Sequence, residues 1–185
     1  MKLPIRSQLG LWIGVCCLAA MLFPSPVPAS RDEYTVKGAF IHNFANLIEW
    51  PASAFPTPNA PLRVAILGPP TFASNMVAYL EGKTVAGRPL QVSRIRSEGA
   101  IGEFHIVFVG EPARSHQRNV IKAARGSRAL TVGESDGFAS DGGMINFFLD
   151  GKKVRFEINR PAAETAGLKI SSRLLRLAVL VEGKQ

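Results

Sequence analysis

The chain has 185 residues, with 22 basic and 14 acidic side chains, two cysteines and a net charge of +8. A chain of this length buries enough surface in one domain to need no disulfide staples. The two cysteines, Cys16 and Cys17, lie side by side near the N-terminus, which excludes a disulfide framework spread along the chain.

The N-terminal residues have the three parts of a secretory signal. Lys2 and Arg6 precede an uncharged, mostly apolar stretch over residues 9–23, and Ala29 offers a small residue at the cleavage position before Ser30. As a helix, this stretch would rise only about 22 Å, whereas a hydrocarbon core is about 30 Å thick. The sequence therefore predicts a cleaved signal peptide over residues 1–29 and one mature domain over residues 30–185, rather than an uncleaved anchor.

Export would remove both cysteines. A lipoprotein is a poor alternative, because no small residue precedes either cysteine. The mature chain would then have neither disulfides nor thiol chemistry. Losing Lys2 and Arg6 leaves 20 basic and 14 acidic side chains, a net charge of +6 that is scattered in small clusters. Either a solvated basic surface or an acidic partner would account for this excess, whereas the compartment disfavours nucleic acid.

The first mature element is predicted to be a helix over residues 34–49. Val36, Phe40 and Phe44 recur there at helical spacing, and Trp50-Pro51 ends the pattern. The proline-rich residues 52–61 are predicted to form a loop.

Three apolar runs then end in glycine, over residues 63–67, 105–109 and 129–132. Runs that are apolar on both faces are typical of central strands in a covered parallel sheet. A strand over residues 90–92 and helices over 71–80, with Thr71 as N-cap, and 115–124 lie between them. This alternation predicts an α/β fold with helices on both faces of an open sheet.

The last third changes to an antiparallel pattern. Residues 144–149 and 152–158 flank Asp150-Gly151, which is a two-residue hairpin signal. A short helix over residues 161–166 should end at Gly167, and Ser171 or Ser172 should cap a final helix that carries Leu174, Leu175 and Ala178. The expected fold class is therefore an open mixed sheet, mostly parallel, with a C-terminal antiparallel hairpin.

Few residues suggest chemistry. None of His42, His105 and His116 has a second ligand at metal-binding spacing, so no metal or cofactor is expected. No nucleophile elbow of the Gly-x-Ser-x-Gly type and no phosphate loop are expected, which disfavours a hydrolase.

One pattern does suggest a small-molecule ligand. If the three glycine-terminated strands are parallel, Gly68, Gly110 and Gly133 lie along one edge of the sheet, with Ser135 beside them. The alternative is that these glycines only permit tight turns.

Several spaced motifs resemble the YfiR/HmsC-like family of periplasmic proteins. They span nearly the whole mature chain in the family's order. The motifs are Val36-Lys37-Gly38-Ala39-Phe40, Asn43-Phe44, Glu49-Trp50-Pro51, the strand that ends at Gly68, Gly142-Gly143-Met144-Ile145, Arg155-Phe156-Glu157-Ile158-Asn159, and residues 167–178.

This resemblance implies a periplasmic regulator without enzymatic activity. Such proteins bind the periplasmic sensor domain of an inner-membrane diguanylate cyclase and hold it inactive, so that release raises cyclic di-GMP and favours biofilm. The best-known members carry disulfide-forming cysteines, which this mature chain lacks, so a redox-sensing role is not implied here. The resemblance leaves homodimer formation open.

The sequence suggests one surface for such a partner. Residues 164–170 place apolar side chains among charged ones, as a modest interface requires. The predicted contact residues are Glu164, Leu168, Lys169, Ile170 and Arg173. Alternatively, Leu168 and Ile170 simply pack the last helix onto the sheet.

Overall fold

The computed structural model describes residues 31–183 and is built around one large sheet. Its eight strands follow the spatial order β10-β8-β7-β6-β5-β2-β4-β3. The strands are β2 (Leu62–Leu67), β3 (Thr84–Val85), β4 (Arg88–Ile95), β5 (Ile106–Val109), β6 (Leu130–Gly133), β7 (Ile145–Asp150), β8 (Lys153–Ile158) and β10 (Val179–Leu180). The predicted signal peptide lies outside the described residues.

The central strands are parallel, as their two-sided apolar pattern predicted. β2 pairs with β4 and β5, β5 pairs with β6, and β6 pairs with β7, all in parallel. Every residue of β5 and β6 is buried, because helices cover both faces at this point. The fold class expected from the sequence is confirmed.

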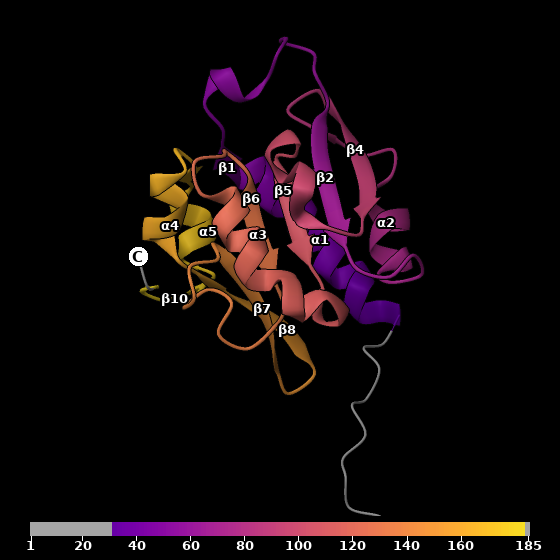
Figure 1. Ribbon diagram of the computed structural model, residues 1–185, viewed down its shortest axis with the longest axis vertical. Coiled ribbons are helices and arrows are strands. Elements are labelled where there is room, and N and C mark those ends of the chain that lie inside the picture. Colours follow the sequence, from indigo (N-terminus) through magenta and orange to yellow (C-terminus); the bar gives the residue numbers. More distant parts are fainter. Residues whose placement is uncertain (1–30, 184–185) are drawn as a thin grey trace, which may run out of the picture.

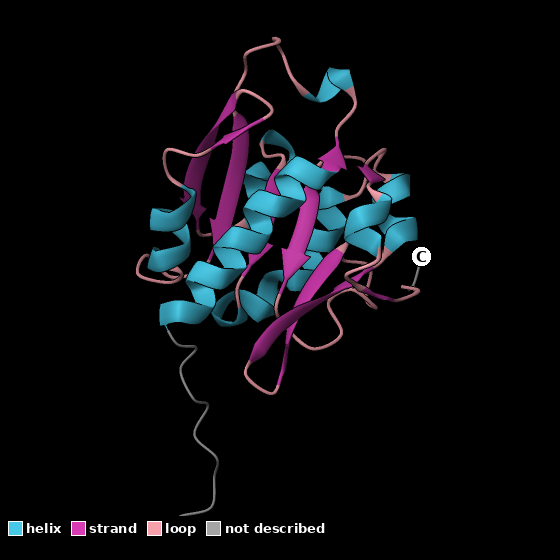
Figure 2. Ribbon diagram, turned by 180° about the vertical axis from the view of Figure 1, so that it is seen from behind, coloured by secondary structure: helices cyan, strands magenta, loops and turns pink. Residues whose placement is uncertain are grey.

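Two helical layers enclose the sheet (Figures 1 and 2). One face carries α1 (Arg31–Leu47), α2 (Ser74–Leu80) and α5 (Ser172–Leu175), whose apolar residues join the larger core cluster. The opposite face carries η2 (Glu98–Glu103), η3 (Glu111–His116) and α3 (Gln117–Ala124), which form a second cluster. Helix α4 (Arg160–Thr165) follows β8 and buries Ala163 in the larger cluster.

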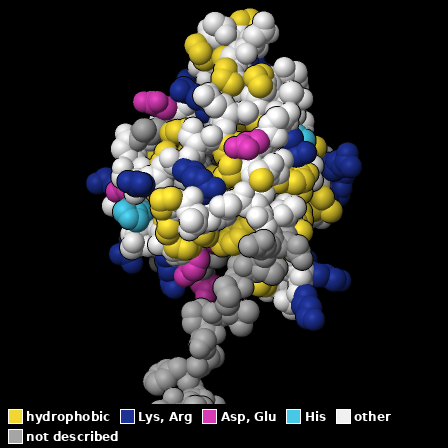
Figure 3. Space-filling view, turned by 90° about the vertical axis from the view of Figure 1, so that its right-hand side faces the viewer, with side chains coloured by type: hydrophobic (Ala, Val, Ile, Leu, Met, Phe, Trp, Pro, Cys, Tyr) yellow, Lys and Arg dark blue, Asp and Glu magenta, His cyan; other side chains and the backbone are white. Residues whose placement is uncertain are grey.

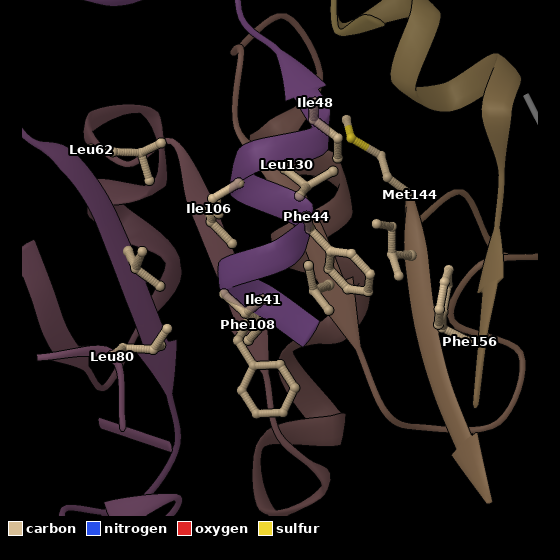
Figure 4. Packing of buried hydrophobic residues seen from close by; sticks show 14 of the residues in the cluster. Ile41, Phe44, Ile48, Leu62, Leu80, Ile106, Phe108, Leu130, Met144 and Phe156 are labelled. Atoms are coloured by element: carbon tan, nitrogen blue, oxygen red, sulfur yellow. The ribbon is translucent and has the colours of Figure 1, made fainter. Parts of the chain in front are cut away.

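Helix α1 is the centre of the larger core. Ile41 and Phe44 are fully buried, and Figure 4 shows them on α1 beside the strand that carries Ile106 and Phe108. The Phe44 ring lies 5.7 Å from the ring of Phe147. This packing explains the helical spacing of the aromatic residues in the sequence.

Helix α1 ends two residues earlier than predicted. Ile48 and Glu49 form the short strand β1 (Ile48–Glu49), which pairs antiparallel with β9 (Lys169–Ile170). Hydrogen bonds from a segment more than a hundred residues away therefore replace the last half-turn of helix. The proline-rich loop after it contains the short helix η1 (Ala52–Ala54) and extends away from the body (Figure 1).

The antiparallel pair of β7 and β8 is confirmed, but its turn lies one residue later than predicted. Asp150 pairs with Lys153, so the turn consists of Gly151 and Lys152, and Gly151 adopts a φ of 62°. This register places Phe147 opposite Phe156. Burial of these side chains fixes the register and hence the turn.

Two predictions at helix ends also differ from the structure. Thr71 does not cap α2, whose N-cap position is Ala73, and the chain forms a turn over residues 69–73. Ser171, one of the two predicted cap residues, caps α5, but the helix ends at Leu175, so Ala178 lies beyond it and not within it as predicted. In the part of the chain that the structure describes, none of the helices combines the length and apolarity needed to cross a bilayer.

Candidate functional site

The three predicted glycines do lie together at the carboxyl edge of the parallel strands. Leu67 pairs with Val109, and Val109 pairs with Gly133, so Gly68 and Gly110 follow at neighbouring positions. This arrangement is the sheet edge at which many α/β proteins bind ligands.

Two phenylalanine rings occupy the space directly above these glycines. A Cβ atom added to Gly110 would lie 2.0 Å from the Phe72 ring, and one added to Gly133 would lie 2.3 Å from the Phe138 ring. The glycines thus allow two aromatic rings to close the edge. A ligand at Gly68, Gly110 and Gly133 would have to displace one of those rings, so binding there stays a prediction.

A buried ionic cluster lies next to the glycines and joins α1 to the end of β6. Lys37 on α1 contacts Glu33 and Glu134, each at 2.5 Å, and the Lys37 and Glu134 side chains are only 6% and 4% exposed. Glu134 also accepts hydrogen bonds from the Glu111 amide at 2.7 Å and from the Tyr34 hydroxyl at 3.1 Å. Both of its oxygens are therefore engaged.

Tyr34 acts as a donor within this cluster. Burial, followed by the charge of Glu134 and the hydrogen bond to it, raises the pKa of Tyr34 well above its ordinary value. The phenol is therefore protonated at any physiological pH. Its ring also lies edge-on against Phe72 at 5.0 Å, which helps to hold that ring over the glycines.

Ser135 belongs to the same polar cluster. Its side chain is buried, and its hydroxyl donates to Glu111 Oε2 at 2.7 Å. Residues 133–137 read Gly-Glu-Ser-Asp-Gly, so the expectation that the chain lacks Gly-x-Ser-x-Gly spacing is wrong. The three histidines have other partners: His42 contacts Thr84, His105 contacts Arg63 and Ala54, and His116 contacts Glu98. The Gly-x-Ser-x-Gly spacing of residues 133–137 is therefore not accompanied by a histidine that could act as a general base for Ser135.

No sequence signal identified this cluster, because Lys37 and Glu134 are 97 positions apart. Its position between α1 and the sheet edge indicates a role in holding the fold together. Within residues 31–183, no group of three or more His, Cys, Asp or Glu side chains is arranged to hold a metal ion.

The predicted contact residues near the C-terminus do not all reach the surface. Leu168 is only 1% exposed and packs in the larger core, whereas Ile170 is half-buried in β9. Glu164, Lys169 and Arg173 are exposed, and Glu164 forms an ion pair with Arg160 at 2.6 Å. Leu168 thus supports this surface from beneath.

Sequence reasoning missed the exposed apolar residues that follow. Leu177, Val179 and Leu180 are 62%, 40% and 58% exposed, and Arg173 and Arg176 lie just before them. These five residues are called the C-terminal patch below. Among the strands that the structure describes, β10 is also at the edge of the sheet, and its outer backbone groups have no strand partner there. The apolar run from Leu177 to Val181 could have indicated this strand in the sequence. It was overlooked because the predicted final helix extended to Ala178, inside the run.

Strand β10, which carries Val179 and Leu180 of the C-terminal patch, lies at the same side of the molecule as α4 and α5 (Figure 1). Elsewhere the basic excess is dispersed: on the face that Figure 3 shows, Lys and Arg side chains are scattered and do not form one continuous patch. Large apolar side chains on a surface, bordered by charged ones, are typical of a protein-binding site.

The fold and these surfaces define an α/β protein with a closed sheet edge and an exposed apolar patch. The model of the YfiR/HmsC-like family matches residues 34–179, and the chain belongs to this family. Members of this family are periplasmic regulatory proteins. The comparison with curated proteins gives no match.

Two solved structures share the fold at low sequence identity. One is a conserved domain protein from Vibrio cholerae, with 13% identity and a TM-score of 0.56 over 80% of this chain and 59% of that one. The other is an ABC domain from Streptococcus pneumonia in complex with L-Trp, with 16% identity and a TM-score of 0.50 over 76% of this chain and 60% of that one. The matched part spans about three fifths of each of those structures.

Proposed function

We propose that this protein binds the periplasmic sensor domain of an inner-membrane diguanylate cyclase and holds the cyclase inactive. Family membership over residues 34–179 is the observation that carries this proposal. The signal-like N-terminus would export the chain to the compartment where the sensor domain lies. The protein would then work at the periplasmic side of the inner membrane, lowering cyclic di-GMP and biofilm formation.

The C-terminal patch is the surface best suited to this partner. Leu177, Val179 and Leu180 supply apolar area, and the edge of β10 offers backbone groups to an extended segment. Exposed Arg173 and Lys169 would complement an acidic rim on the sensor domain. Glu164 and half-buried Ile170 lie on the adjoining α4–β9 segment and extend the proposed contact.

Inhibition requires only that this surface binds the inactive sensor conformation more tightly than the active one. A preference of about 1.4 kcal/mol shifts the ratio of the two conformations tenfold. A patch with a few apolar residues can supply this difference, since a small number of side chains carries most of the energy of an interface.

The proposal is tested in a strain that retains the partner cyclase. Deleting the gene should raise cyclic di-GMP, and the wild-type gene should restore the lower level. Leu180→Asp should fail to restore it, because a carboxylate would face the apolar part of the interface. Leu149→Asp is the matched control: Leu149 is 53% exposed but lies on the hairpin of β7 and β8.

Each outcome is decisive for one part of the proposal. An unchanged cyclic di-GMP level after deletion would refute the inhibitory role. Full complementation by Leu180→Asp would leave the role intact and would remove the C-terminal patch from it.

A further inference from the structure

A cavity of about 360 Å³ lies between the end of α3 and helix α4, away from the glycine edge. Its size falls in the range of small-molecule pockets, roughly 300–1,000 Å³. The residues that line it come from α3, the start of β6, the approach to β7, α4 and the end of the described chain. They are Ile121, Ala124, Arg125, Gly126, Thr131, Gly142, Met144, Asn159, Pro161, Ala162, Thr165, Ala166 and Gly183.

Most of this lining is apolar, and its polar side chains have donors to offer. Thr131 is 2% exposed, and its oxygen accepts a hydrogen bond from the Met144 amide at 3.0 Å, so the hydroxyl proton remains for a ligand. Asn159 uses one amide hydrogen on the Ala139 carbonyl at 2.9 Å and has a second.

The charge of the lining favours an anion. Among residues 31–183, Arg125 is the one charged residue of the lining, and no ion pair links its guanidinium to a carboxylate in this part of the chain. A guanidinium can hold a carboxylate through two parallel hydrogen bonds. An apolar interior with an arginine and buried donors fits a ligand that has an apolar body and one carboxylate.

We propose that this cavity binds a small carboxylic acid, with the apolar part against Ile121, Met144 and Ala162 and the carboxylate held by Arg125. Thr131 and Asn159 would orient the ligand through their remaining hydrogens. The site shares helix α4 with the proposed cyclase contact, but its lining residues include neither Glu164 nor Ile170 and none of the C-terminal patch.

Sodium octanoate is a suitable probe, with octan-1-ol as a neutral analogue of the same chain length. Calorimetric titration of the protein over residues 30–185 should show one octanoate site. Arg125→Gln should weaken octanoate binding on the order of tenfold, because the octanoate carboxylate loses a charge-assisted hydrogen bond. Binding of octan-1-ol, which has no carboxylate, should stay unchanged. Arg128→Gln is the control, since Arg128 is an exposed arginine that does not line the cavity.

A second variant tests the location without touching the core. Thr165 is exposed and lines the cavity, so Thr165→Trp should block it and abolish octanoate binding with little effect on folding. Circular dichroism and thermal unfolding verify that each variant is folded. The proposal is overturned if octanoate fails to bind at millimolar concentration, if Arg125→Gln binds it as tightly as the wild type, or if Thr165→Trp does not affect it. Cyclic di-GMP levels in the deletion strain report on the cyclase proposal separately.

Discussion

Replacing Lys37 with methionine tests the buried ionic cluster most directly. The Lys37 and Glu134 side chains are 6% and 4% exposed and lie 2.5 Å apart, so neither is solvated by bulk water. Removing the cation would leave the buried Glu134 without its cation and next to the like charge of the partly buried Glu33. Breaking a buried pair in this way costs about 3–5 kcal/mol. That is a large part of the roughly 5–15 kcal/mol that keeps a domain folded.

Urea unfolding followed by circular dichroism measures this loss as a fall in the midpoint at constant slope. The double variant Lys37→Met with Glu134→Gln should regain much of the stability, since no unpaired charge then remains from this pair. With the single variant Glu134→Gln added, the coupling energy is the effect of the double variant minus the effects of the two single variants.

An exposed ion pair on the same protein provides the control. Arg155 and Asp150 lie 2.9 Å apart with side chains about half exposed, so Arg155→Met should change the free energy of unfolding by no more than about 1 kcal/mol. The reasoning fails if Lys37→Met is as stable as Arg155→Met, because the cluster would then carry no more energy than a surface pair.

Three further outcomes follow from the contacts. Burial lowers the pKa of His105, whose Nδ1 accepts a hydrogen bond from the Arg63 amide, so the unfolded chain binds a proton at this histidine more readily than the folded chain. The free energy of unfolding should therefore fall as the pH drops below about 6.5. His105→Gln should flatten this pH dependence in urea titrations at several pH values. Gly110→Ala should lower stability by about 1–3 kcal/mol, because the added methyl displaces Phe72; a neutral result would mean that the ring moves freely. Leu168→Ala should cost about 2–5 kcal/mol in thermal unfolding, whereas Leu177→Ala should stay within about 0.5 kcal/mol, and equal effects would contradict the assigned burial.

The parts of the fold that the sequence predicted well are those set by local pattern. The sequence runs that form β2, β5 and β6 are apolar on both faces. Helical segments lie between them, so these short runs are best explained as strands of a sheet that helices cover on both faces. The strand β8, whose successive side chains alternate between more and less exposed, was predicted with nearly correct bounds. The approximate place of α4 also followed from local signals, and Gly167, with a φ of 75°, lies just beyond its C-cap residue Ala166.

The parts that were missed depend on contacts between distant residues. Ile48 leaves α1 because β9 supplies it with a strand partner, and no local signal in the sequence announces that pairing. Similarly, Ala73 replaces Thr71 as the α2 cap, in a turn that carries Phe72 over Gly68 and Gly110. Local propensity cannot anticipate a ring that must fill a particular gap.

The candidate sites show the same division. The placement of Gly68, Gly110 and Gly133 at one edge could be predicted from strand direction alone. The closing of that edge by Phe72 and Phe138, and the burial of Leu168, could not, because both are properties of side-chain packing. Residues 164–170 would have the same sequence pattern whether Leu168 faced a partner or the core, so the sequence alone could not decide between the two.

The central claim is that the C-terminal patch binds a cyclase sensor domain, and calorimetric titration of the two purified partners tests it most directly. The protein over residues 30–185 should bind the sensor domain with one defined stoichiometry. The variant Leu180→Asp should lose this binding, whereas Leu149→Asp should keep it. Binding by Leu180→Asp at wild-type affinity would contradict the assigned surface, and no binding by the folded wild-type protein would contradict the proposed function.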